Sequence, residues 1–79
     1  MHQVIKTPAQ VGEILRARRR SRRLSQAAVA GKLGVSQSRL SVLEADAAGL
    51  TVERFLVLAK LLGLELVLRD DEPPAKARW

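Results

Sequence analysis

The sequence predicts a small, mainly α-helical domain of four or five helices that is followed by one β-strand near the C-terminus. Apolar residues make up 47% of the chain but aromatic residues only 3%, a composition typical of helices built on Leu, Val and Ala. Four segments repeat apolar residues at helical spacing between residues that begin and end helices. One later segment alternates apolar and polar residues with a period of two, which predicts a strand.

Length and composition limit the function classes. The 79 residues suffice for one domain, and a domain of this size buries so little surface that a second subunit would add needed stability. Cysteine is absent, which excludes disulfides, thiolate metal sites and a cysteine nucleophile. No apolar run approaches the ~20 residues that span a bilayer, and the N-terminus lacks the apolar segment of a signal peptide. We therefore expect a cytoplasmic protein that does not bind membranes.

The first helix is expected after an N-terminal lead, residues 1–6. Thr7 supplies a capping hydroxyl, Pro8 suits the first helical position, and Gln10 completes a capping box. The inward stripe is predicted to contain Val11, Ile14, Leu15 and Arg18. The helix should continue to about residue 22, and the Arg18 guanidinium should reach a carboxylate.

Two short helices joined by a sharp turn follow. Ser25 is predicted to cap the second helix, whose buried stripe is Val29, Ala30 and Leu33. Gly34 ends that helix in the left-handed conformation, so that Val35 folds back on Ala30. Ser36 caps the third helix, with Leu40 and Leu43 facing inward. Gly31 lies inside the second helix, where it costs about 1 kcal/mol relative to alanine.

The fourth helix and the strand complete the expected domain. Leu50, Thr51 and Phe55 have the spacing of a hydrophobic staple, which begins a helix that runs through residue 62 and ends at Gly63. Residues 64–69 alternate as a half-buried strand. A strand without a partner pairs most simply with its own copy across a two-fold axis, and the alternative partner is the segment 2–6. The dimer interface is then expected to contain Leu64, Leu66, Val67 and Leu68.

Charge is distributed unevenly along the chain. The formal net charge is +6, with six arginines between residues 16 and 23 and an acidic run at residues 70–72. Such asymmetry suggests a polyanionic partner, although a basic run can also be only a solvated surface. The last ten residues, 70–79, are charged and contain proline, and they are expected to be flexible when free.

The segment from residue 24 to residue 44 carries the most specific pattern. Its diagnostic residues are Leu24, Ser25, Gln26, Ala30, Gly34, Val35, Ser36, Gln37, Leu40, Leu43 and Glu44. It resembles the helix-turn-helix of the phage repressors, which include the lambda repressor and Cro and are also called xenobiotic-response-element-like. This resemblance places a helix-turn-helix domain at residues 7–63, with the motif at 25–44, and implies a lambda-repressor-like fold.

The resemblance also implies how DNA is bound. The helix from Ser36 would lie in the major groove, where Gln37, Ser38 and Arg39 face the base edges. Gln26 would contact a phosphate and brace Gln37. The full set of expected DNA-binding residues is Ser25, Gln26, Ser36, Gln37, Ser38, Arg39, Ser41, Arg22 and Arg23. Many relatives carry a basic residue in place of Val42, and Glu44 is expected to pair with Arg18.

Over its whole length the chain resembles the HipB-like antitoxins. The shared features are a short lead, four helices, the segment GLELVLRD and a tail that ends in tryptophan. This resemblance implies a homodimer that represses its own operon by binding an inverted-repeat operator in double-stranded DNA. It also implies binding to a HipA-like serine/threonine kinase toxin, with Trp79 docking into the toxin.

Two other functions stay open on the sequence alone. The chain could be a stand-alone phage or plasmid repressor without a toxin, or a protein-interaction module that has lost DNA binding. An enzyme is not expected, because the single histidine is His2 and no nucleophile has a neighbouring base. We expect no catalytic residue, no metal site and no cofactor.

Overall fold

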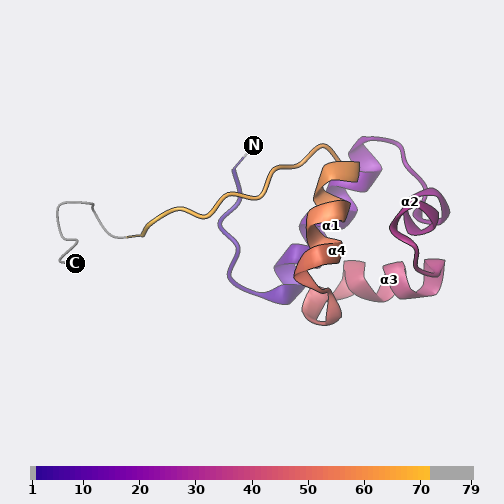
Figure 1. The fold of residues 1–79 in the computed structure, drawn as a ribbon, viewed down its shortest axis with the longest axis horizontal. Coiled ribbons are helices and arrows are strands. Elements are labelled where there is room, and N and C mark those ends of the chain that lie inside the picture. The colour runs from indigo at the N-terminus through magenta and orange to yellow at the C-terminus, as the bar shows by residue number, and fades with distance from the viewer. Residues whose placement is uncertain (1, 72–79) are drawn as a thin grey trace.

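The computed structural model describes residues 2–71 and contains a mainly helical domain, as predicted (Figure 1). The elements are α1 (Pro8–Ser21), α2 (Gln26–Leu33), α3 (Gln37–Ala45), the 3₁₀ helix η1 (Ala47–Gly49) and α4 (Val52–Leu61). Residues 2–6, the N-terminal lead, precede α1 without regular structure. Residues 64–71 leave the end of α4 as an extended segment that we call the arm.

Each α-helix begins at the hydroxyl residue that the sequence predicts. Thr7, Ser25, Ser36 and Thr51 have extended backbones, and each side chain accepts a hydrogen bond from the N–H three residues later at 3.0–3.1 Å. These bonds satisfy N–H groups that have no partner inside the helix. Because the interaction is local, the four helix starts could be predicted to the residue.

The turn between α2 and α3 also has the predicted form. Gly34 lies in the left-handed region with a φ of 80°. The N–H groups of Gly34 and Val35 both donate to the carbonyl of Ala30, at 2.9 and 3.0 Å. The chain therefore reverses sharply, and Val35 packs against the core beside Ala30.

The core lies where the four helices meet. Its most buried side chains are Leu15, Leu40, Leu43, Leu58 and Leu62, each no more than 2% exposed. Helix α3 packs on α1 and α2, and α4 packs on α2. Ala30 is 2% exposed, which agrees with the expectation that α3 crosses closely above it. Leu50 and Phe55 of the predicted staple pack against this core.

The predicted inward stripe of α1 is confirmed at Leu15 and Val11, which belong to or pack against the core, but the buried arginine is Arg19 and not Arg18. The buried positions are Gly12, Leu15 and Arg19, whereas Val11, Ile14 and Arg18 are half-buried. The reason is a close helix crossing: a Cβ on Gly12 would lie 2.6 and 2.7 Å from the carbonyl oxygens of Leu43 and Glu44. Apolar spacing alone does not identify a position that is buried because it lacks a side chain.

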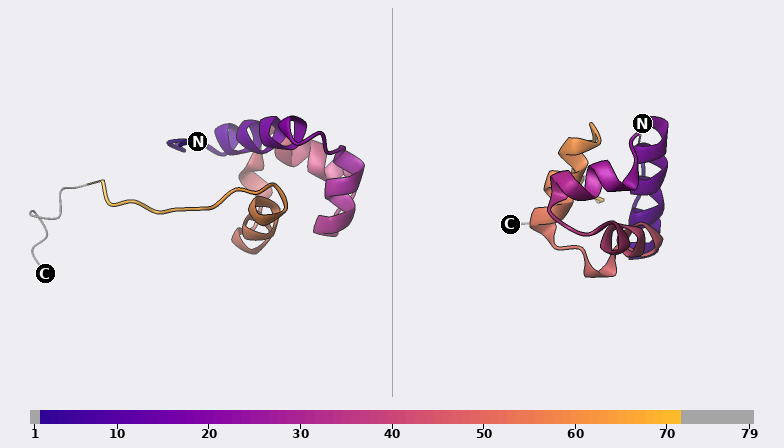
Figure 2. Two further views of the ribbon diagram at one scale, coloured as in Figure 1. Left: turned by 90° about the horizontal axis from the view of Figure 1, so that it is seen from above. Right: turned by 90° about the vertical axis from the view of Figure 1, so that its right-hand side faces the viewer.

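The arm does not form a strand in the described chain. The N–H of Leu64 donates to the carbonyl of Ala59 at 2.8 Å, and residues 65–70 then continue without regular structure. No strand occurs within residues 2–71, so the period-two segment has no partner there. The arm and the lead both lie away from α2 and α3 (Figure 2). Within the same residues, no helix has the length and apolar character needed to cross a bilayer.

Candidate nucleic-acid interface

Helix α3 has one anchored face and one open face. Leu40 and Leu43 point into the core at 1% and 2% exposure, whereas Gln37, Ser38 and Ser41 are exposed and Val42 is 56% exposed. The only acidic residue of the helix, Glu44, is buried. The open face therefore presents an amide, hydroxyls and one apolar side chain without a negative charge.

A buried ion pair fixes α3 against α1, but the partner of Glu44 is not the predicted Arg18. Arg19 Nε donates to Glu44 Oε2 at 2.6 Å, and Arg19 Nη2 donates to Glu44 Oε1 at 3.1 Å. Arg19 Nη1 also donates to the carbonyl of Leu24 at 2.8 Å, where α1 turns toward α2. These charge-assisted hydrogen bonds of Arg19 join α1, α3 and the segment before α2.

Gln26 is held by the same carboxylate. Its Nε2 donates to Glu44 Oε1 at 3.0 Å, and no hydrogen bond joins Gln26 to Gln37 in the described residues. In the described residues, therefore, the Gln26 amide binds the ion pair, and its contact with Gln37 stays a prediction for the DNA-bound protein. Glu44 orients the Gln26 amide, which leaves its Oε1 and its second N–H for other partners.

Arg18 instead binds the end of α4. Its Nε donates to the carbonyl of Leu62 at 2.8 Å, and its Nη2 donates to the carbonyl of Gly63 at 3.4 Å. The last carbonyls of a helix lack partners inside it and carry partial negative charge, so an arginine stabilises them. Arg18 therefore ties α1 to the root of the arm and is not available to a carboxylate.

Arg39, the third expected base reader, contacts its own chain. Its Nη2 donates to the carbonyl of Gly49 at 3.2 Å, so the side chain bridges from the first turn of α3 to η1. A Cβ on Gly49 would lie 2.6 Å from Arg39 Nη2. The sequence did not indicate this contact, because the two residues lie in different elements.

The C-terminal end of α1 carries exposed positive charge. Arg20, Arg22 and Arg23 are exposed there. Arg23 has a φ of 57° and is the only residue other than glycine with a positive φ in residues 2–71. An arginine in this left-handed conformation costs on the order of 1–2 kcal/mol, which glycine would avoid. The backbone conformation at this position therefore favours glycine over arginine.

The residues expected at the dimer interface divide into two groups. Leu64 is half-buried and packs against the core of its own chain. Leu66, Val67 and Leu68 are 38%, 72% and 102% exposed. Trp79, the expected toxin contact, lies outside the described residues.

Comparisons with known proteins agree with this geometry. The helix-turn-helix domain family matches residues 10–71, whereas no curated protein matches the chain. A solved HipA–HipB–O2–O3 complex contains a chain 25% identical to this one, with a TM-score of 0.77, covering 90% of this chain and 100% of its own.

Two further solved structures give similar values. A HipB variant in complex with an O2 20mer is 26% identical, with a TM-score of 0.78 and coverage of 91% of this chain and 100% of its own. A HipB–O4 20mer complex is 25% identical, with a TM-score of 0.76 and coverage of 90% and 100%. The chain therefore belongs to the helix-turn-helix domain family and has the HipB-like form of that fold.

Proposed function

We propose that this chain is a sequence-specific DNA-binding repressor that acts as the antitoxin of a HipA-like kinase toxin and represses its own operon. The observation that carries the proposal is the open face of α3. A buried ion pair and a leucine core anchor the other side of this helix, while Gln37 and Ser38 stand at its exposed N-terminal end. The solved HipB complexes with O2 and O4 20mers support it, because their chains share this fold.

The exposed groups suit two kinds of DNA contact. Gln37, Ser38 and Arg39 are proposed to read base edges in the major groove, where a side-chain amide or guanidinium can form paired hydrogen bonds. The proposed phosphate contacts are Ser25, Gln26, Ser36, Ser41, Arg22 and Arg23. Arg39 reaches the bases only if its hydrogen bond to the carbonyl of Gly49 opens. With that bond intact, the proposed contact of Arg39 is with the DNA phosphate backbone.

The proposed active species is a homodimer. The arm exposes Leu66, Val67 and Leu68 to water and has no partner strand in residues 2–71. Pairing the arms of two copies would join their backbones in an isologous interface and bring Leu66 and Leu68, which share one face of the strand, beside the same residues of the partner. Two α3 helices would then enter successive major grooves of an inverted repeat, with half-site centres roughly 34 Å apart.

Toxin binding is proposed from the HipA–HipB–O2–O3 complex. This chain covers the whole of a chain in that assembly, at 25% identity. Trp79 is the proposed anchor in the toxin, because a large aromatic side chain is a common hot spot of protein interfaces. The chain itself is proposed to act as a non-enzymatic regulator.

A mobility-shift assay tests the proposal. The purified protein is titrated against its own upstream DNA and against random DNA of equal length. We expect specific retention of a dimer, and we expect Gln37→Ala to weaken cognate binding by about 1–3 kcal/mol while random DNA binding hardly changes. Equal losses on both DNAs would exclude base reading by Gln37. Absence of any specific retention would refute the repressor function.

A further inference from the structure

We propose that the N-terminal lead, residues 2–6, is a strand of the dimer interface and pairs with the arm of a second copy of this chain. This pairing rests on the homodimer of the proposed function and adds a second interface segment to it. The resulting sheet would contain four strands in the order lead, arm, arm, lead, with each lead paired to the arm of the other copy.

The lead is already held in position within one chain. Gln10 Nε2 donates to the carbonyl of Val4 at 2.6 Å, and Gln10 Oε1 accepts the N–H of Lys6 at 2.9 Å. The expected capping box thus has only one of its two bonds, the one from Gln10 N–H to the Thr7 hydroxyl. The Gln10 side chain binds the lead and does not accept from the N–H of Thr7. These two hydrogen bonds hold the lead against α1. The lead and α1 run in opposite directions (Figure 1).

Both segments leave apolar side chains in water. Val4 and Ile5 of the lead are 63% and 45% exposed, and Val67 and Leu68 of the arm are 72% and 102% exposed. In a sheet, one side chain of each pair would lie beside one from the other segment on each face, which would remove part of this apolar surface from water in both copies.

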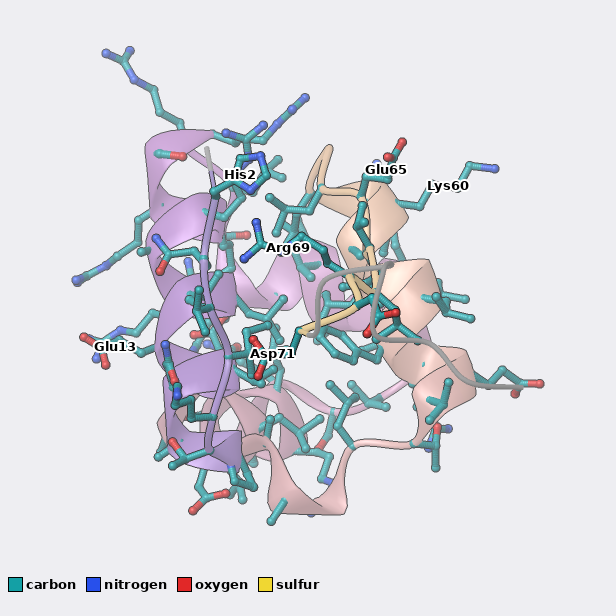
Figure 3. The ribbon with its side chains drawn as sticks, turned by 90° about the vertical axis from the view of Figure 1, so that its left-hand side faces the viewer. His2, Glu13, Lys60, Glu65, Arg69 and Asp71 are labelled. Carbon is teal, nitrogen blue, oxygen red and sulfur yellow. The ribbon has the colours of Figure 1, made fainter. Side chains whose placement is uncertain are left out.

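Lead and arm also lie on the same side of the molecule without touching through their backbones. Figure 3 views that side and labels His2 on the lead and Arg69 and Asp71 on the arm. No backbone–backbone hydrogen bond joins residues 2–6 to residues 64–69 in the described chain. The lead therefore does not pair with its own arm, although that pairing was the alternative predicted from sequence.

The two edges of a strand explain why the lead is needed. Pairing of the two arms uses one edge of each arm and leaves the other edge with unpaired N–H and C=O groups. An isolated two-stranded ribbon is marginally stable in water, whereas three or more strands form a stable sheet. The two leads raise the number of strands from two to four.

Two hollows beside these segments offer space for side chains of a second copy. One lies between the lead and α1, where Ile14 and Ala17 are its apolar lining and the remaining lining residues are polar, namely Gln3, Gln10, Glu13, Arg18 and Ser21. The other lies between α4 and the root of the arm, and its lining includes Leu56 and Leu66. The exposed apolar residues of a partner arm have the chemistry to fill the apolar parts of both.

Cross-linking between single-cysteine variants tests the pairing without background, because the natural chain has no cysteine. Gln3→Cys, Val4→Cys and Ile5→Cys are each made in a chain with a size tag. Each is mixed with untagged Val67→Cys, allowed to exchange subunits and oxidised mildly. A disulfide requires Cα atoms about 4.4–6.8 Å apart, so only neighbouring strands react rapidly. The control partner is Val52→Cys on α4, which is 73% exposed and so matches the 72% of Val67.

We expect hetero-disulfides between lead and arm in which every second lead position reacts fastest, because alternate residues of a strand face the same side. Lead cysteines that react with Val52→Cys as fast as with Val67→Cys would overturn the proposal. The proposal would also be overturned if light scattering showed dimers but Val67→Cys formed disulfides only with another Val67→Cys chain and never with a lead cysteine. A wild-type protein that is monomeric by light scattering would refute the homodimer itself, which separates the two failures.

Gln10→Ala provides a second measurement on the full chain. Loss of the two hydrogen bonds to the lead should raise the dimer dissociation constant by about tenfold, the effect expected for a few cross-strand pairs. The control is Glu13→Ala, which removes another exposed side chain from α1. An unchanged dissociation constant for Gln10→Ala would show that the lead does not contribute to the interface.

Discussion

At the scale of single residues, Glu44 has the largest structural role in the candidate site. Its carboxylate accepts both donors of Arg19 and one donor of Gln26, and the residue is only 5% exposed. The ion pair sets the position of α3 relative to α1, and the same carboxylate orients a proposed phosphate ligand. The fold and the proposed phosphate contact of Gln26 therefore share one buried group.

Glu44→Gln is expected to lower the free energy of unfolding by about 3–5 kcal/mol. The variant leaves the buried Arg19 guanidinium without a counter-charge, and breaking such a pair costs about 3–5 kcal/mol. That cost is comparable to the whole stability of a small domain. Urea denaturation followed by circular dichroism measures it. The control Glu13→Gln changes an exposed carboxylate and should leave the unfolding midpoint within error of the natural protein.

Arg23 is expected to show a conflict between stability and DNA binding. Arg23→Gly should stabilise the fold by about 1 kcal/mol, because glycine adopts the left-handed backbone without strain. The same change should weaken DNA binding and lower the slope of log affinity against log salt by about 0.9 for each phosphate that the protein no longer neutralises. Thermal unfolding and a salt series in the mobility-shift assay measure the two effects.

The comparison variant Arg23→Ala separates charge from backbone. It removes the guanidinium but keeps a side chain at a φ of 57°. We expect weaker DNA binding without the gain in stability. If both variants keep the wild-type slope of log affinity against log salt, Arg23 is not one of the phosphate contacts.

At the scale of the elements, two glycines on neighbouring helices have opposite roles. Gly31 lies within α2, and a Cβ at this position meets nothing within 4 Å. Gly12 lies within α1, where a Cβ would clash with two backbone carbonyls of α3. The first glycine only lowers helix propensity, whereas the second permits the crossing of α1 and α3.

The same substitution at both positions should therefore change stability in opposite directions. Gly31→Ala is expected to raise the free energy of unfolding by about 1 kcal/mol through helix propensity. Gly12→Ala is expected to lower it by about 1–3 kcal/mol through overpacking, because a backbone cannot move aside as a side chain can. Denaturant unfolding of the two variants measures both changes. A Gly12→Ala variant that is more stable than the wild type would refute the close crossing of α1 and α3.

At the scale of the whole molecule, the candidate interface and the proposed dimer contacts lie at different ends. Helices α2 and α3 occupy one end, whereas the lead and the arm lie away from them (Figure 2). Arg18 joins α1 to the root of the arm, because it binds the carbonyls of Leu62 and Gly63 just after α4. A second copy can therefore bind without covering α3.

Loss of the arm leucines should affect dimers before it affects the fold. Leu66→Ala combined with Leu68→Ala removes side chains that are 38% and 102% exposed in the single chain. We expect near-natural thermal stability at low concentration but weaker dimerisation and a concentration-dependent loss of operator binding. Analytical ultracentrifugation gives the dissociation constant. Val52→Ala on α4 is the control. A double variant with the same dimer dissociation constant as the wild type would refute the arm interface.

The sequence alone determined the helix starts and the turn, which depend on neighbouring residues, apart from the Gln10 half of the capping box at α1. The four N-cap hydroxyls, the left-handed Gly34 and the core positions Leu40 and Leu43 all occur as predicted. The helix-turn-helix pattern was equally readable, because its diagnostic residues lie within one segment of 21 residues. Such features follow from hydrogen bonds and spacings that span one or two helical turns.

Only the tertiary structure decided which long side chain meets which partner. Arg18 and Arg19 are adjacent on α1, yet one binds the end of α4 and the other binds Glu44 on α3. A rotation of α1 by one residue exchanges them, and that rotation is set by the glycine at the helix crossing. The contact from Arg39 to Gly49 joins two elements and was hidden for the same reason. The bonds from Gln10 to Val4 and Lys6 span only six and four residues, but the lead has no regular structure whose pattern would indicate them. Spacing along a chain specifies a helical face to within about one residue, whereas packing between helices requires one orientation.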